Sequence, residues 1–110
     1  MIDWGRVADL REEIGAEDFD EIIDLFLSEV DDAIARLRAG PDPGTLGDDL
    51  HFLKGSALNL GFLAFADLCQ QGESAAGRGA AETVDVAAIL TCFDGSRTAF
   101  LDGVGARFPA

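Results

Sequence analysis

The sequence has no tyrosine and only one histidine, one lysine and one tryptophan among its 110 residues. It also has only two cysteines, Cys69 and Cys92. They do not form a CxxC pair and are too few for a disulfide framework, so we expect reduced thiols on apolar helix faces rather than a redox site. A single histidine without paired cysteines cannot supply the three or four ligands of a usual transition-metal site. We therefore expect the chain to hold no metal and no cofactor.

Basic residues are also scarce, with eight against 21 acidic residues and a net charge of −13 at pH 7. A chain of this charge is repelled by nucleic-acid phosphates and by anionic lipid headgroups, which leaves proteins or small molecules as partners. Long apolar runs are missing too, since a membrane-spanning helix needs about 20 consecutive apolar residues. Acidic residues interrupt the N-terminal segment, so we expect no signal peptide and a cytoplasmic protein.

The length suits one domain, residues 1–110, and 48% hydrophobic residues are enough for a core. Because the chain begins at Met1 and one domain fills it, we expect it to be free-standing rather than part of a larger protein. We also expect it to be a monomer.

The apolar residues recur with the period of an α-helix, and no segment alternates like a strand. We expect a short helix that Asp3 caps and Gly15 ends, followed by four longer helices. The four longer helices are expected at about residues 17–39, 43–60, 63–78 and from about 83 onward. The second of them is expected to have Asp42 as its cap and Pro43 as its first helical residue. The predicted fold is all-α: an antiparallel up-down-up-down four-helix bundle with a short extra N-terminal helix.

The only histidine, His51, lies three residues before the only lysine, Lys54, one turn apart on the same helix face. At about 100° per residue, the apolar stripe of this helix centres about 210° away from His51. Two glycines, Gly47 and Gly55, flank His51 on its own face. Because glycine within a helix costs up to about 1 kcal/mol against alanine, they are hard to explain by stability, and they leave the imidazole open to another protein.

This arrangement is compatible with several roles. A metal site lacks ligands, and Ser56 faces away from His51, so a serine–histidine pair is disfavoured. Lys54-Gly55-Ser56 also lacks the residue order of a phosphate-binding loop. What remains is nucleophilic use of the imidazole itself, with the ammonium of Lys54 neutralising a phosphoryl group. On spacing alone, an ordinary surface histidine beside a solvated lysine fits equally well.

The segment from His51 to Gly61, HFLKGSALNLG, resembles the signature of histidine-containing phosphotransfer (HPt) domains. That signature has Lys, Gly and Ser three, four and five residues after the histidine, then Asn and Gly, and all these positions match. Leu68, Cys69 and Glu73 also look like the next helix of the family. Leu50 and Gly72 depart from it, because the family usually has a smaller residue before the histidine and a larger apolar one at the second position.

The resemblance implies that His51 accepts a phosphoryl group from a receiver-domain aspartate and passes it to another receiver, with Lys54 assisting and Gly55 admitting the partner. It implies structural roles for Ser56, Asn59 and Gly61. The expected protein is thus a phosphocarrier rather than an enzyme. Its expected partners are response-regulator receiver domains or a hybrid histidine kinase, and the receiver is expected to supply Mg²⁺. Two alternatives are an adaptor that docks receivers without transfer and a kinase-like dimerisation module, the latter disfavoured because no nucleotide domain is present.

Apolar side chains on the face of His51 predict where the partner docks. Leu58 lies at about 340° on the helical wheel, and Phe62 would lie near about 20° if the helix continued. Exposed apolar groups beside a reactive residue are typical of an interface. The docking surface predicted from the sequence therefore comprises Gly47, Gly55, Leu58 and Phe62. The alternative for Phe62 is that it folds back after Gly61 and closes the end of the bundle.

Overall fold

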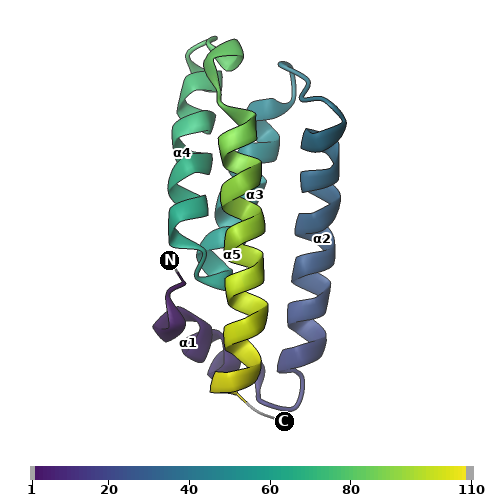
Figure 1. Ribbon diagram of the computed structural model, residues 1–110, viewed down its shortest axis with the longest axis vertical. Helices are drawn as coiled ribbons and strands as arrows, with labels where there is room; N and C mark the ends of the chain where they lie inside the picture. The colour runs from purple at the N-terminus through teal and green to yellow at the C-terminus, as the bar shows by residue number, and fades with distance from the viewer. Residues whose placement is uncertain (1, 109–110) are drawn as a thin grey trace.

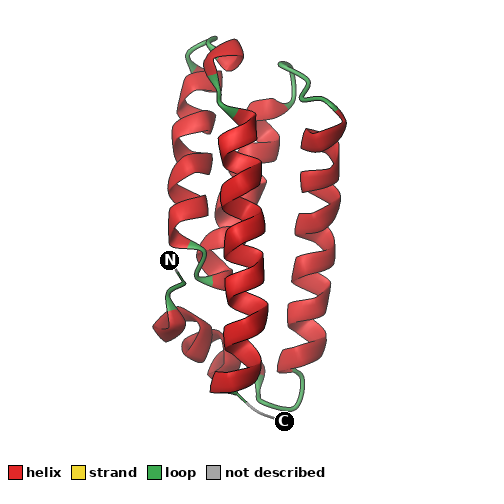
Figure 2. Cartoon of the chain, viewed as in Figure 1, coloured by secondary structure: helices red, strands yellow, loops and turns green. Residues whose placement is uncertain are grey.

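The computed structural model describes residues 2–108 and has four long helices in a bundle with a short helix across one end (Figure 1). The helices are α1 (Trp4–Ile14), α2 (Phe19–Ala39), α3 (Leu46–Leu60), α4 (Leu63–Gly77) and α5 (Val86–Arg107), and a single 3₁₀ turn, η1 (Ala81–Thr83), precedes α5. The four long helices alternate in direction (Figure 1). Within residues 2–108 there is no strand, only an isolated bridge between Ile2 and Phe62 (Figure 2). The predicted all-α bundle is confirmed.

Caps and glycines end the helices at several of the predicted positions. The carboxylate of Asp3 accepts a hydrogen bond of 3.1 Å from the backbone N–H of Arg6, which caps α1. Gly61 ends α3 in the left-handed conformation, with φ of 76°. A Cβ at Gly61 would also lie 2.7 Å from the carbonyl oxygen of Asp3, so this turn requires glycine for two reasons.

The start of α3 differs from the prediction. Asp42 does not cap a helix that begins at Pro43; its carboxylate instead accepts the N–H of Gly44 at 2.8 Å, and its carbonyl accepts the N–H groups of Thr45 and Leu46. These bonds form a separate turn, and α3 begins at Leu46 with Thr45 as its N-terminal neighbour. α5 likewise begins at Val86 rather than near Thr83, because Asp85 caps it.

The core lies between the four long helices and is formed by the predicted apolar faces. Its largest fully buried side chains include Phe19, Phe62, Phe65, Phe93, Phe100, Leu50, Leu53 and Leu60. The helical spacing of the apolar residues also predicts a core position for Leu101, and this prediction is wrong, because the residue is 41% exposed. None of the helices within the described residues is both long enough and apolar enough to span a membrane.

α3 and α4 form a helical hairpin, and Leu50 and Gly72 meet across it. A Cβ added to Gly72 would lie 2.6 Å from Leu50 Cδ1 and 3.2 Å from Val84 Cγ1. The two departures from the HPt pattern are therefore complementary, because the larger residue on α3 fills the space left by the smaller one on α4. This contact lies directly inside the two surface residues that follow in sequence, His51 and Glu73.

Candidate functional site

His51 lies on the outer face of α3, with its side chain 70% exposed, as the helical wheel predicts. Its Nδ1 lies 2.8 Å from Oε2 of Glu73 on α4. No other hydrogen bond or ion pair of the ring occurs within the described residues. The imidazole is therefore held at one nitrogen and open at the other.

Glu73 determines which ring nitrogen carries the proton. The pKa of its carboxyl group is lowered from its ordinary value of 4.5, first by the contact with Lys54 and then by the hydrogen bond with His51, against the opposing effect of burial. An ionised carboxylate can only accept hydrogen bonds, so Nδ1 of His51 must be the donor. In the neutral imidazole the lone pair then lies on Nε2, which gives the exposed nitrogen the properties of a nucleophile.

Lys54 lies one turn further along α3, and its ammonium is held by two residues of α4. Nζ lies 2.8 Å from Oε1 of Glu73 and donates a hydrogen bond of 2.9 Å to Oε1 of Gln70. Glu73 thus links His51 and Lys54 through its two oxygens. An ammonium has three N–H donors, so one remains for an incoming group.

The two glycines beside His51 are not required by the packing of the chain itself. A Cβ at Gly55 would meet nothing within 4 Å, and one at Gly47 would lie 3.4 Å from the Cβ of Ala76, an ordinary contact. Gly47 lines a shallow groove of about 360 Å³ next to the imidazole, together with Pro43, Gly44, Asp48, His51, Glu73, Ala76 and Gly77. On both sides of His51 the surface therefore lacks side chains that would block access to the imidazole.

Apolar side chains are exposed near Lys54, at the end of the hairpin. Leu58 on α3 and Leu63 on α4 are each 49% exposed, and both line a hollow of about 270 Å³ that Lys54, Ala66, Asp67 and Gln70 complete. Exposure of Leu58 was predicted; Leu63 was missed, because the sequence does not show that the first turn of α4 faces the same way as the last turn of α3.

Phe62 does not belong to this surface, and its predicted exposure is wrong. It is 1% exposed and packs between Phe93 and Phe100, with ring centroids 6.4 and 5.5 Å away. The left-handed turn at Gly61 takes the chain out of the helix, so the wheel of α3 does not apply to Phe62. The residue closes the end of the bundle instead.

The remaining motif residues lie around the end of α3. Ser56 is half-buried, and Asn59 is exposed and accepts a hydrogen bond of 3.3 Å from Arg6 on α1. Gly61 makes the turn described above. These placements are compatible with structural roles and put none of the three in contact with the imidazole.

Three residues of α4 that contact or support the His51–Lys54 pair had no role assigned from the sequence: Gln70, Glu73 and Ser74. Their spacing, three and four residues apart, gives one polar face of a helix and was a usable signal. Which face of α3 they meet depends on the register of the hairpin, which the sequence alone does not contain.

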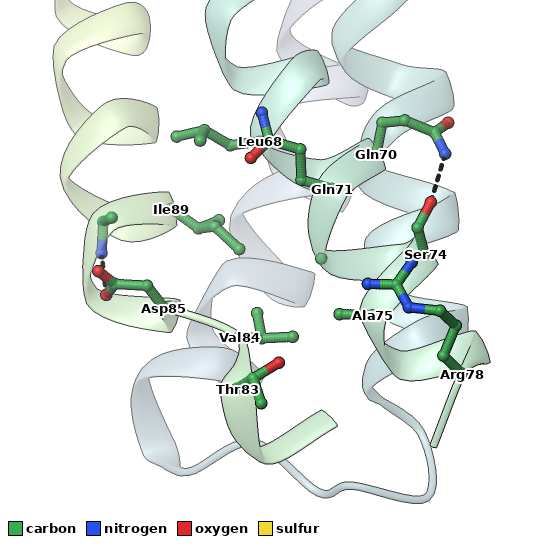
Figure 3. Close-up of a pocket in the computed structure, with 12 residues that line it drawn as sticks. Leu68, Gln70, Gln71, Ser74, Ala75, Arg78, Thr83, Val84, Asp85 and Ile89 are labelled. Carbon is green, nitrogen blue, oxygen red and sulfur yellow. Dashed lines mark hydrogen bonds between the residues drawn. The ribbon is translucent and has the colours of Figure 1, made fainter. Parts of the chain in front are cut away.

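A larger groove, of about 540 Å³, lies between α4, η1 and the start of α5 (Figure 3). Leu68, Val84 and Ile89 point into it, and the hydrogen bond from Gln70 Nε2 to Ser74 Oγ runs along its edge (Figure 3). It contains neither His51 nor Lys54.

Both cysteines are free thiols, as predicted. Burial, with smaller contributions from Cys92 and Glu73, raises the pKa of Cys69 to about 12. Such a thiol is protonated at neutral pH and unreactive. Within residues 2–108 no three His, Cys, Asp or Glu side chains come together as metal ligands.

Comparison with known proteins identifies the family. The family model described as Hpt domain matches residues 21–99, well over half of the chain and the whole of the site described above. Searches of curated proteins and of solved structures gave no match. The chain belongs to the Hpt domain family, the histidine-containing phosphotransfer modules of phosphorelays.

Proposed function

We propose that His51 is the phosphoacceptor and that the chain carries the phosphoryl group between aspartates of response-regulator receiver domains. The observation that carries this proposal is the bond of 2.8 Å between Nδ1 and the ionised Glu73, which leaves the lone pair on the exposed Nε2. In the neutral imidazole, such a nitrogen can attack an activated phosphoryl group.

The proposed step is a transfer in which every atom is accounted for. The Nε2 lone pair attacks the phosphorus of a receiver aspartyl phosphate, the N–P bond forms, and the P–O bond to the aspartate breaks to release its carboxylate. The imidazole ring then carries positive charge, which the carboxylate of Glu73 at Nδ1 stabilises. The reverse step on a second receiver returns the phosphoryl group to an aspartate.

Lys54 stabilises the phosphoryl oxygens in this step. Its ammonium is anchored by Glu73 and Gln70 at 2.8 and 2.9 Å and retains one donor. Charge stabilisation by a preorganised donor is worth a few kcal/mol in a transition state. The remaining positive charge at the reacting centre is Mg²⁺, which we place on the receiver, so the chain itself uses no cofactor.

The receiver docks over the outer face of α3 and α4. Gly47 and Gly55 let its backbone approach the imidazole, and the exposed Leu58 and Leu63 provide apolar contact beside Lys54. A receiver of a hybrid histidine kinase would offer the same chemistry as one of a separate response regulator. We propose that the chain acts in these complexes as a monomer.

The test is uptake of phosphate from a phosphorylated receiver by the wild type and by His51→Gln. We expect the wild type to gain an acid-labile, base-stable phosphate and the variant to gain none while keeping its helical circular dichroism, because an exposed side chain contributes little to packing. Equal labelling of both proteins would refute the assignment of His51. Binding of the receiver without any transfer to the wild type would identify the chain as an adaptor.

A further inference from the structure

On α4, Gln70 binds Lys54 and is itself held by Ser74, a pairing that no motif of the sequence indicates. Oε1 of Gln70 accepts a hydrogen bond of 2.9 Å from Nζ of Lys54, and Nε2 of Gln70 donates one of 3.0 Å to Oγ of Ser74 (Figure 3). Gln70 and Ser74 are four residues apart, one turn along the same face of α4. The three side chains therefore form a continuous chain of hydrogen bonds that ends at the ammonium.

We propose that Gln70, with its amide fixed by Ser74, is a positioning residue that sets where the ammonium of Lys54 points during phosphoryl transfer. The proposal rests on the role of Lys54 in the proposed function. The orientation of the amide follows from chemistry, because an ammonium has only donors and must face the oxygen of Gln70. The NH₂ group then faces Ser74, whose oxygen keeps the amide from rotating.

A neutral acceptor at this position has a specific consequence. Glu73, the other partner of Lys54, is an anion at 2.8 Å, and alone it would draw the ammonium into a simple ion pair. Gln70 draws the ammonium away from Glu73 without neutralising its charge. The positive charge is thereby kept at a defined place and remains available to the phosphoryl oxygens.

α4 supplies a matched control. Gln71 has the same residue type at the next position and makes a hydrogen bond of 2.9 Å within the helix, to Asp67. It lines the groove between α4 and α5 (Figure 3), and within residues 2–108 its one side-chain hydrogen bond is to Asp67 and none is to Lys54. Gln71→Met thus reproduces the loss of an amide and of one helix-surface hydrogen bond, with a residue of similar helix propensity.

The first experiment measures the rate constant of phosphoryl transfer from a phosphorylated receiver, and the receiver dissociation constant separately. We expect Gln70→Met to slow transfer about three- to tenfold with unchanged receiver affinity, Ser74→Ala to slow it about two- to fivefold, and Gln71→Met to have no effect. In a Lys54→Ala background Gln70→Met should have no further effect, because its action passes through Lys54. An equal slowing with and without Lys54, or an equal effect of Gln71→Met, would overturn the proposal.

A second measurement does not depend on transfer. Lys54 is the only lysine in the chain, so lysine labelled at Cε gives one side-chain NMR signal. We expect its two Hε protons to have distinct shifts in the wild type and in Gln71→Met, and to merge in Gln70→Met and Ser74→Ala as the stem becomes free to rotate. If His51 took up no phosphate while these spectra behaved as stated, the proposed function would fail and the positioning of Lys54 would stand; unchanged spectra in Gln70→Met would overturn the positioning itself.

Discussion

Leu50 and Gly72 are in contact beneath the His51–Glu73 pair. This contact predicts that Gly72→Ala destabilises the wild type but stabilises the Leu50→Ala variant. In the wild type, Gly72→Ala gains up to about 1 kcal/mol of helix propensity. However, the new methyl would lie 2.6 Å from Leu50 Cδ1 and 3.2 Å from Val84 Cγ1. Leu50 is fully buried and cannot turn away freely, so overpacking of about 1–3 kcal/mol outweighs the gain. We expect Gly72→Ala to lower the free energy of unfolding by about 1 kcal/mol.

Leu50→Ala removes the nearest of the atoms that the new methyl group would meet, at 2.6 Å. By itself it leaves a cavity and should destabilise the chain by about 3–5 kcal/mol. In this background Gly72→Ala keeps its helix propensity and fills part of the cavity, so it should stabilise by about 1 kcal/mol. The coupling free energy between the two sites is then about 2 kcal/mol, which is larger than the deviation from additivity found for independent sites.

Urea unfolding followed by circular dichroism gives all four free energies of the cycle. The m-values should agree among the variants, which shows that the same surface is exposed on unfolding. If Gly72→Ala stabilised the wild type, or if its effect were the same in both backgrounds, the assignment of Leu50 as the residue that fills the space at Gly72 would be wrong.

Three further predictions concern the candidate site and one concerns the turn after α3. Lys54→Ala should slow phosphoryl transfer about ten- to a thousandfold with little change in melting temperature, and a collapse of the melting temperature with unchanged transfer would reverse this interpretation. Gly55→Gln should weaken receiver binding in a titration of labelled receiver and leave the helical signal intact, because a side chain there meets only open space within the chain. Leu58→Asp should weaken the same binding, and unchanged affinity of both variants would place the docking surface elsewhere. Gly61→Ala should destabilise the fold by more than about 1 kcal/mol in urea unfolding, because φ is 76° and a Cβ would lie 2.7 Å from Asp3.

Helical periodicity and glycine placement were sufficient to predict the bundle. The apolar face of α2, with Phe19, Ile23, Leu27 and Val30, is buried as its spacing predicts. These signals are local, since each follows from residues within a few turns. Where a local signal competed with a tertiary contact the prediction was wrong, as at Phe62, which leaves the helical wheel at Gly61 and joins the aromatic core.

In the candidate site, too, the residues on one helix could be predicted from the sequence, and the contacts between helices could not. His51, Lys54 and Gly55 belong to one helix, so their common face could be deduced from spacing. Glu73 and Gln70 come from the other side of a hairpin, and their contacts at 2.8 and 2.9 Å depend on its register. That register is set in part by the pairing of Leu50 with Gly72, which only the packed structure shows.

The lowered pKa of Glu73 predicts how the pairing of α3 with α4 responds to acid. A carboxyl group whose pKa is lower in the folded than in the unfolded chain contributes stability above the unfolded value, near 4.5, and loses it as pH falls through the folded value. The difference in unfolding free energy between the wild type and Glu73→Gln should therefore shrink as the pH falls below about 4.5.

The measurement is urea unfolding of both proteins at a series of pH values from about 3 to 7. His51→Gln serves as the control, because it leaves the contact of Lys54 with Glu73 intact and that contact is the larger cause of the lowered pKa. It should retain most of the acid-dependent change. A difference between wild type and Glu73→Gln that stayed constant down to about pH 3, or that grew as the pH fell, would show that Glu73 is not the ionised acceptor that orients His51.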